Sequence, residues 1–451
     1  MGSNSRAPPS GRTPPSPHQM TSLRRTLGTA DLTFLVIGNV IGSGIFLVPS
    51  TILRQTGSVR VALVVWAVGG LLSLFGALSY AELGAMDGSS GGLYAYTRDA
   101  FGRFAAFLYG WTMFFVVCAG TVAALAVAAA NYMGQFVELT AGMKQAIAVG
   151  IIVSIAVMNV RGTRGSATLL NWTTSIKVVA IVVMSLLLLM LGTSPVATAD
   201  TPLTVPPSVL SAVATAMIAV LWAYEGWQYV TFSAGEARDP QRALPIAIAL
   251  GTLALIAIYL LANFAYLAAL GPAGVAASDR VAGDATAAVL GPWAGKAIAL
   301  AIIVSMVSAA HGTVMTLPRV FFSMAQDKLL FARFAEVHPR FGTPAVAIIA
   351  SCVWASVLAL SGTFDQLLTY VIFIGWIFYA LGAAAVIRLR VIRPDAVRPY
   401  RVPGYPFTPL LFVLAAIVIV GNQIVTEPRQ SAIGLGMVLL GVPAYWWWNR
   451  R

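Results

Sequence analysis

Two short stretches place helix-breaking residues inside long apolar runs. The first is Gly42-Ser43-Gly44, and the second is Tyr224-Glu225-Gly226. Glycine costs roughly 1 kcal/mol relative to alanine in a helix interior, so both stretches favour local unwinding. In hydrocarbon the freed backbone groups must find partners, and a break survives only where it faces protein, a cavity or a ligand. Two broken helices in corresponding halves of a membrane protein indicate the binding site of a transporter.

The ends of a broken helix differ in chemistry. Where the second half begins, uncapped N–H groups and the positive end of the helix dipole suit an anionic group, and the Ser43 hydroxyl adds a hydrogen bond. Where the first half ends, before Glu225, free carbonyl groups suit an ammonium group. The alternative for Gly42-Ser43-Gly44 is a small-residue contact that lets two helices pack closely.

Three ionisable residues lie inside apolar runs. Three roles are open for Glu225: it binds a cationic or polar group, it titrates during transport, or it hydrogen-bonds the broken helix and holds its shape. Placing a carboxylate at this depth of the membrane costs free energy. Lys177 lies near one end of its run, so its ammonium group either stays inside or snorkels to the interface. His311 is a candidate proton carrier, because histidine titrates near neutral pH, or else a hydrogen-bonded core residue.

The elements that carry these residues are apolar helices. The chain has 451 residues, of which 58% are hydrophobic and only 10% are charged, whereas a soluble domain has about 25% charged residues. Runs of membrane-spanning length recur, and the alternating pattern of a transmembrane β-strand is absent. The sequence predicts an all-α integral membrane protein with twelve spans, at residues 31–53, 60–85, 101–133, 144–160, 167–192, 208–235, 243–270, 292–324, 343–361, 366–389, 406–425 and 431–448.

The net charge of +12 is explained by topology rather than by nucleic-acid binding. Of the 28 Lys and Arg residues, 21 fall on the side of the N-terminus, which the positive-inside rule places in the cytoplasm together with the C-terminus. Lys177 lies within a span, and the six on the other side are Arg54, Arg60, Lys144, Arg280, Lys296 and Arg429. Both cysteines, Cys118 and Cys352, fall in spans, which favours small buried apolar residues over a disulfide or a metal site.

The spans form one predicted transporter domain, residues 23–451. Residues 1–22 are rich in Pro and Ser and are predicted to be disordered. Both halves begin with a glycine-interrupted span, which suits two inverted repeats over 31–192 and 208–389, with 406–448 as an addition. Residues 325–343 are charged and are predicted to form an amphipathic cytoplasmic helix.

Several ordered motifs carry a family resemblance from about residue 24 to the C-terminus. They resemble the amino acid–polyamine–organocation superfamily, and within it the bacterial relatives of L-type amino acid transporters. The motifs are Ile41-Gly42-Ser43-Gly44-Ile45-Phe46; Ser79-Tyr80-Ala81-Glu82-Leu83-Gly84 with Ser90-Gly91-Gly92-Leu93-Tyr94-Ala95-Tyr96; Trp222-Ala223-Tyr224-Glu225-Gly226-Trp227 with Gly235-Glu236-Ala237-Arg238-Asp239-Pro240; Pro339-Arg340-Phe341-Gly342-Thr343-Pro344; and Arg398-Pro399-Tyr400-Arg401-Val402-Pro403-Gly404-Tyr405-Pro406.

The resemblance implies a leucine-transporter-like fold, with helices 1 and 6 discontinuous, that moves amino acids by alternating access, often as an exchanger. It implies that Ser43 and Gly44 bind the carboxylate of the substrate and that Trp222 acts as a gate that closes over the substrate. It also implies that the Lys177 ammonium sits where sodium sits in sodium-driven relatives. The substrate-binding residues that it implies are Val40, Ile41, Gly42, Ser43, Gly44, Trp222, Ala223, Glu225 and Gly226.

The sequence departs from the family pattern at Glu225, where better-known animal members have a small residue, and at His311, where an asparagine is common. We therefore keep a proton-coupled symporter, with Glu225 and His311 as proton-linked residues, beside a sodium-independent exchanger. A membrane sensor that binds amino acids without useful flux is a third hypothesis. Glu82 and Glu236, near the cytoplasmic ends of their spans, are predicted to be structural or gating residues.

An enzyme is not expected, because no catalytic constellation stands out, and no cofactor or metal is predicted. In animal L-type transporters, a cysteine between spans 3 and 4 joins an ancillary glycoprotein. The corresponding stretch, Asn131 to Lys144, has no cysteine, so no disulfide-linked subunit is expected. We predict a multi-pass protein of the bacterial inner membrane, and the amino acid that it carries stays open.

Overall fold

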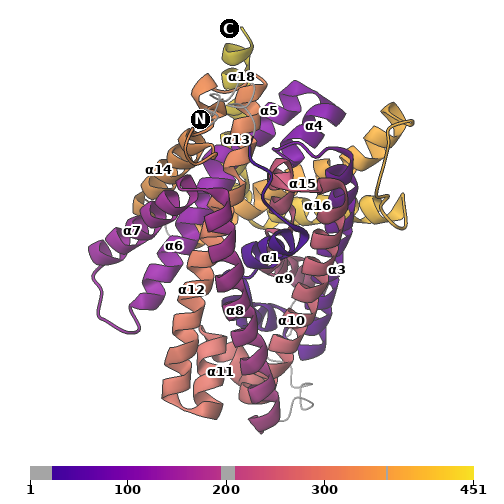
Figure 1. The fold of residues 1–451 in the computed structure, drawn as a ribbon. Helices are drawn as coiled ribbons and strands as arrows, with labels where there is room; N and C mark the ends of the chain where they lie inside the picture. The colour runs from indigo at the N-terminus through magenta and orange to yellow at the C-terminus, as the bar shows by residue number, and fades with distance from the viewer. Residues whose placement is uncertain (1–22, 195–208, 362–363, 451) are drawn as a thin grey trace, which may run out of the picture.

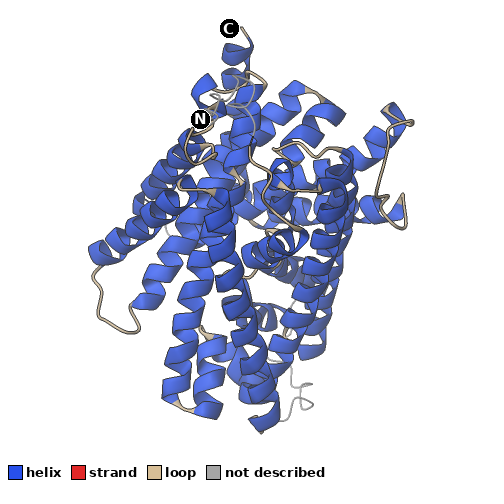
Figure 2. Ribbon diagram, in the orientation of Figure 1, coloured by secondary structure: helices blue, strands red, loops and turns tan. Residues whose placement is uncertain are grey.

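The computed structural model describes residues 23–194, 209–361 and 364–450. Within these ranges every element is a helix (Figure 2), and the one bridge of strand type joins Leu27 to Ala237. The predicted disorder of residues 1–22 concerns residues outside the described ranges. The helices are α1 (Thr29–Val40), α2 (Gly44–Thr56), α3 (Val59–Met86), α4 (Leu93–Phe101), α5 (Arg103–Thr112), the π-helical η2 (Met113–Cys118), α6 (Ala119–Met133), α7 (Ala141–Val160), α8 (Thr163–Leu191), α9 (Val209–Ala223), the 3₁₀ helix η3 (Trp227–Glu236), α10 (Pro240–Ala277), α11 (Val281–Leu290), α12 (Pro292–Thr316), α13 (Pro318–Gln326), the 3₁₀ turn η4 (Ala332–Ala335), α14 (Ala345–Ser361), α15 (Phe364–Ile392), α16 (Phe407–Thr426), α17 (Pro428–Leu439) and α18 (Gly441–Asn449).

Most predicted spans appear as apolar helices of membrane length. In the described part of the chain nine helices meet this criterion, and the bent pair α1–α2 makes a tenth. The two other predicted spans coincide with α9 followed by η3, and with α14, which is apolar but has only 17 residues. The structure therefore agrees with an all-helical membrane protein.

Both glycine-containing stretches interrupt a helix. α1 ends at Val40, α2 begins at Gly44, and the two halves are bent by 45°. α9 ends at Ala223, and the chain continues through Gly226 into the 3₁₀ helix η3. Gly226 has a φ of 117°, a conformation that glycine adopts more readily than other residues.

The broken helices lie inside the bundle. In Figure 1, α1 and α9 occupy the centre, and α3, α6, α8, α10 and α12 run around them. Of α1, the residues from Leu35 to Val40 are all buried, and the apolar side chains among them belong to a continuous core with α6, α9, α10 and α12. The same view places α4, α13 and α18 at one end of the molecule and α11 at the other.

Two loops differ from the sequence-based expectation. Residues 325–343 contain the end of α13 and the single turn η4 rather than an amphipathic helix, so that prediction was wrong. The loop between predicted spans 7 and 8 contains the short helix α11, which was not predicted. α10 also continues past its predicted end, with a kink at Gly271 where φ is 67°.

Candidate binding site between two broken helices

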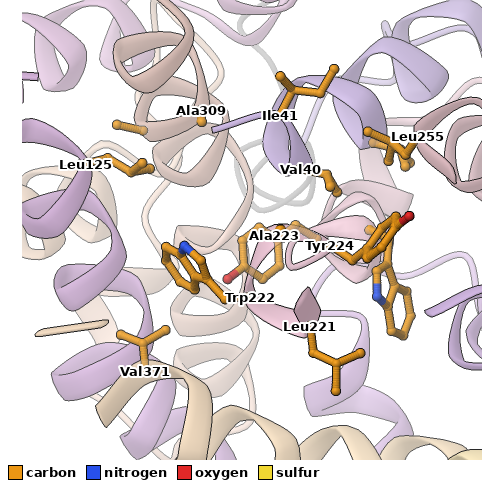
Figure 3. Close-up of a cluster of buried hydrophobic side chains, with 14 of the residues drawn as sticks. Val40, Ile41, Leu125, Leu221, Trp222, Ala223, Tyr224, Leu255, Ala309 and Val371 are labelled. Carbon is orange, nitrogen blue, oxygen red and sulfur yellow. The ribbon is translucent and has the colours of Figure 1, made fainter. Parts of the chain in front are cut away.

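The two helix breaks pack directly against each other. A Cβ atom on Gly44, at the start of α2, would lie 2.6 Å from the Cα atom of Ala223, at the end of α9. A Cβ atom on Gly226 would lie 3.2 Å from the backbone of Asn39 in α1. Figure 3 shows Val40 beside Ala223 at this crossing. Glycine at these two positions therefore allows the two backbones to meet.

The beginning of α2 presents unused hydrogen-bond donors. Ser43 is the N-cap of α2, and its side chain makes no capping hydrogen bond. Its hydroxyl is buried and has no partner among the described residues. The first N–H groups of a helix, here those of Gly44 and Ile45, have no acceptor within the helix. This end of α2 has the chemistry to hold an anionic group.

The ends of α1 and α9 meet at one tyrosine hydroxyl. Tyr259 on α10 has its hydroxyl 3.1 Å from the carbonyl oxygen of Val40 and 3.0 Å from that of Ala223, within donating distance of both. The Trp222 carbonyl accepts from the N–H of Glu225 at 3.0 Å. Each of these carbonyl oxygens has a second lone pair, so an ammonium group can still bind there.

The Lys177 side chain is buried inside the bundle. Its ammonium group is buried and donates to the carbonyl oxygens of Gly38 at 2.6 Å and Ile41 at 2.7 Å. Ser305 on α12 donates to the carbonyl oxygens of Ile41 at 2.9 Å and Gly42 at 3.2 Å. The Lys177 side chain thus does not snorkel to the interface. It ties α8 to the C-terminal end of α1, where the helix dipole favours a cation.

Glu225 is held by three donors on one carboxylate oxygen. Oε1 accepts from Gln228 Nε2 at 2.7 Å, from the Tyr379 hydroxyl at 2.5 Å and from the Tyr229 hydroxyl at 3.3 Å. Tyr379 belongs to α15, so this carboxylate joins the second break to a third part of the bundle. The geometry agrees with the hypothesis that Glu225 holds the shape of the break.

Both ring nitrogens of His311 are occupied. Nδ1 lies 3.1 Å from the side-chain nitrogen of Asn159, and Nε2 lies 3.1 Å from the carbonyl oxygen of Ser166. A neutral imidazole that accepts at Nδ1 and donates at Nε2 satisfies both contacts. His311 therefore links α12 to α7 and α8, as the core-residue hypothesis expects.

A small cavity lies at the breaks, and a large one lies next to it. The small cavity measures about 20 Å³, room for about one water molecule. The large one, the vestibule, measures about 790 Å³ and is lined mainly by residues of α2, α9, α15, α16 and α17. Trp222 is the one lining residue that the two cavities share; Figure 3 shows its indole between Leu125 and Val371. The small cavity is lined by Asn39, Val40, Gly42, Ser43, Gly44, Thr121, Leu125, Trp222, Glu225, Tyr229 and Thr313.

Six of the nine predicted substrate-binding residues line the small cavity. The other three, Ile41, Ala223 and Gly226, do not line it. They instead carry the contacts with Lys177, Tyr259 and Asn39 described above. Sequence reasoning missed Asn39, Thr121 and Tyr259. Each is a polar residue within an apolar run, but the position of its side chain depends on helix rotation.

The opposite end of the bundle, which we call the sealed end, is closed by a buried ion pair. Arg319 on α13 donates to both carboxylate oxygens of Glu236, at 2.8 and 3.1 Å, and both side chains are buried. The Thr163 hydroxyl donates to Glu236 at 2.6 Å. The Glu236 carbonyl accepts from the N–H of Leu27, and Leu27 pairs with Ala237. The segment before α1 is thereby joined to the end of η3.

Two further contacts strengthen the sealed end. Glu82 on α3 accepts two hydrogen bonds from Arg390 of α15, at 2.9 and 2.6 Å, and one from the N–H of Val402 at 2.7 Å. The Tyr94 hydroxyl on α4 donates to Asp327 at 2.8 Å. Burial and the neighbouring Asp327 carboxylate raise the pKa of Tyr94 above its usual range, so this hydroxyl keeps its proton at neutral pH.

Comparison with known proteins identifies the family to which the chain is related. A model of the amino acid permease family matches residues 27–442. The serine/threonine exchanger SteT of Bacillus subtilis is 32% identical over 433 residues, 95% of this chain and 98% of the exchanger. The human cystine/glutamate transporter is 31% identical over 454 residues, 98% of this chain and 89% of that transporter. The mouse b(0,+)-type amino acid transporter 1 is 31% identical over 416 residues, 90% of this chain and 84% of that protein.

These relatives are transporters and not enzymes, and the apolar helices agree with a multi-pass membrane location. On this evidence the chain belongs to the amino acid permease family of the amino acid–polyamine–organocation superfamily.

Proposed function

We propose that this protein exchanges α-amino acids across the membrane by alternating access, without sodium. The observation that carries the proposal is the meeting of two helix breaks at one small cavity next to the vestibule. Helix N-termini and free helix carbonyls offer a carboxylate site and an ammonium site without charged side chains. The family assignment and the exchangers among the relatives support the same function.

In the proposed complex, the substrate carboxylate binds the Ser43 hydroxyl and the N–H groups at Gly44. Its ammonium group binds at the carbonyl groups of Val40, Trp222, Ala223 and Glu225, which requires Tyr259 to share or release two of them. Ile41, Gly42 and Gly226 shape the breaks. The present cavity is too small for an amino acid. Trp222 therefore moves to admit the substrate and returns to close over it.

Sodium independence is supported by Lys177. Its side-chain nitrogen already donates to the carbonyl groups at the end of α1, and it thereby occupies the acceptors that a sodium ion would need. Glu225 lines the cavity, which supports proton-coupled symport as the second candidate. His311 adds less to that candidate, because both of its ring nitrogens already have protein partners.

The topology belongs to the same proposal. We place both termini in the cytoplasm of a bacterial cell, which makes the vestibule external and the sealed end cytoplasmic. Twelve spans result if α9 with η3 counts as the sixth and α14 as the ninth, with inverted repeats over 31–192 and 208–389. The protein works without a disulfide-linked partner in this proposal.

The test is uptake of radiolabelled amino acids into proteoliposomes, either empty or preloaded with unlabelled amino acid, with sodium or choline outside. We expect uptake that needs internal amino acid and is the same in both salts. Uptake into empty vesicles driven by a sodium gradient would contradict the proposal. Uptake driven by an inward proton gradient would establish the symporter, and binding without flux would establish a sensor.

A further inference from the structure

A polar hollow lies at the sealed end, beside the segment that precedes α1. It measures about 480 Å³, within the range of about 300–1,000 Å³ that is typical of small-molecule sites. Three parts of the chain meet there: the residues before α1, the loop after α3 and the start of α10. The charged residues that line the hollow are Arg25, Asp87, Arg238 and Asp239. Cations and carboxylates on one hollow are complementary to a ligand that carries both signs of charge.

Most of these charges are available to a ligand. The guanidinium groups of Arg25 and Arg238 form no hydrogen bond or ion pair with any residue that the structure describes. Asp239 is the N-cap of α10, but its side chain makes no capping hydrogen bond. Asp87, by contrast, accepts from the backbone N–H and from the hydroxyl of Ser89, each at 2.9 Å. Two guanidinium groups and the Asp239 carboxylate therefore remain for binding.

The outer face of α10 continues from the hollow as an apolar stripe. Arg242 lies in the first turn of this membrane-length helix. Exposed apolar residues follow it on the same face: Ile246, Leu250, Leu253 and Ala257. Their spacing of three or four residues keeps them in one line. From Ile246 to Ala257 the helix rises about 16 Å, close to half of the hydrocarbon thickness of about 30 Å. The stripe thus has the length of one acyl chain in one leaflet.

We propose that the hollow binds the headgroup of a phospholipid that carries both a phosphate and a primary ammonium group, as phosphatidylethanolamine does, with an acyl chain along the α10 stripe. The phosphate pairs with Arg25 and Arg238, and the ammonium group pairs with Asp239. Basic pockets at the cytoplasmic membrane surface suit lipid phosphates, and hydrogen bonds between charged groups are about twice as strong as neutral ones.

The carboxylate selects among headgroups. Phosphatidylglycerol brings a phosphate but no cation, so Asp239 would face a negative charge without compensation. Phosphatidylcholine brings a quaternary ammonium group, which has no N–H to donate. Of these three headgroups, only ethanolamine offers Asp239 both a positive charge and hydrogen-bond donors.

The position of the hollow gives the lipid a structural role. Arg25 precedes α1, and Asp239 begins α10, so one headgroup joins these two segments. It acts beside the backbone contacts between Leu27 and the end of η3. A bound lipid therefore braces the sealed end from its membrane side, and this role is independent of which solute the protein carries.

The experiment measures lipid binding to the purified full-length protein in detergent by native mass spectrometry. Phosphatidylethanolamine, phosphatidylcholine and phosphatidylglycerol with identical acyl chains are titrated separately. We expect phosphatidylethanolamine to bind about tenfold more tightly than either of the others, as the loss of one charge-assisted hydrogen bond implies. Soluble phosphoethanolamine at the same concentration should not displace it, because it has no chain for the stripe.

Two variants separate the contributions of the two charges. We expect Asp239→Asn, which keeps a side chain suited to an N-cap, to remove the preference for ethanolamine over choline. Arg238→Gln should weaken both lipids about tenfold and leave their ratio unchanged, because both carry the phosphate. Glu336→Gln and Arg333→Gln, at exposed positions outside the hollow, are the matched controls. A misfolded variant would lower the binding of all lipids alike and would not change the ratio.

Any of three results would overturn the proposal. The first is phosphatidylcholine or phosphatidylglycerol that binds as tightly as phosphatidylethanolamine. The second is an unchanged preference in Asp239→Asn. The third is displacement of the lipid by soluble phosphoethanolamine, which would assign the hollow to a soluble ligand. None of these results bears on amino acid exchange, which is measured separately in proteoliposomes.

Discussion

The two ends of the helix bundle are held together by different forces. At the sealed end, Glu236 and Arg319 form an ion pair whose side chains are 0% and 1% exposed. At the vestibule end, the Arg54–Asp279 pair spans 3.5 Å with side chains 46% and 89% exposed, beside a cavity of about 790 Å³. Exposed pairs contribute little to stability, whereas a buried pair is costly to break. The sealed end is therefore closed by specific contacts, and the vestibule ends at one side chain, Trp222.

In the proposed alternating access, this difference predicts which segments move together. The segment before α1 and the end of η3 share backbone hydrogen bonds at Leu27 and Ala237. The inner halves of both broken helices are thus joined, and Arg319 ties the pair to α13. In that proposal, opening the sealed end separates these contacts from α13 and α8, and closing the vestibule brings α2 and α9 towards α15 and α16.

The largest expected effect comes from breaking the buried ion pair. Arg319→Ala leaves the Glu236 carboxylate buried without its partner, which lowers the free energy of unfolding by about 3–5 kcal/mol. Arg54→Gln, the control at the vestibule end, lowers it by less than about 1 kcal/mol. Denaturation of both variants in detergent measures the difference. Equal losses would remove the distinction between the two ends.

The next effect comes from Lys177, the proposed internal cation. Lys177→Met leaves the carbonyl groups of Gly38 and Ile41 without their side-chain donor. Each unpaired carbonyl group carries a free-energy penalty of about 1–3 kcal/mol. We expect exchange to fall about 100-fold, since every 1.4 kcal/mol is roughly tenfold. Initial rates in proteoliposomes measure this. Lys296→Met, at an exposed lysine of α12, is the control. Normal exchange by Lys177→Met would show that α1 needs no tether from α8.

Removal of the partition between the cavities has a smaller effect. Trp222→Ala connects the vestibule to the cavity at the breaks, so a bound substrate is no longer covered. We expect KM to rise about tenfold, equivalent to about 1.4 kcal/mol. Trp293→Ala, at a tryptophan that is 81% exposed, should transport normally. An unchanged KM for Trp222→Ala would assign the gate to another residue.

The smallest effect is expected for Ser305→Ala. This change removes one donor from the carbonyl groups of Ile41 and Gly42, while Lys177 still binds Ile41. The loss of about 1 kcal/mol corresponds to roughly a fivefold slower exchange. The double variant with Lys177→Met measures whether both donors act on the same helix end. Strictly additive effects would argue against a shared role.

The breaks were predictable from the sequence because they rest on local chemistry. Gly42 and Gly44 in one apolar run, and Gly226 in another, weaken a helix wherever they fall. Lys177 was also found early, because a charge within an apolar run stands out.

Other parts of the site depend on tertiary packing. Tyr259 and Thr121 resemble many other polar residues in membrane helices until helix rotation places them at the breaks. The partners of Glu225 include Tyr379, which is 154 residues away in the chain. Such contacts follow from how helices pack, and local patterns do not encode that packing.

The most direct test of the account is the accessibility of the two ends to a membrane-impermeant thiol reagent. Thr215→Cys places a thiol in the vestibule, and Ser323→Cys places one at the buried sealed end. The native Cys118 and Cys352 are buried, so the unmodified protein gives the background. We predict that the thiol at position 215 reacts without substrate and that the thiol at position 323 does not. An exchanged amino acid should slow the first reaction and speed the second. Substrate that leaves both rates unchanged, or raises both together, would contradict alternating access between these two ends.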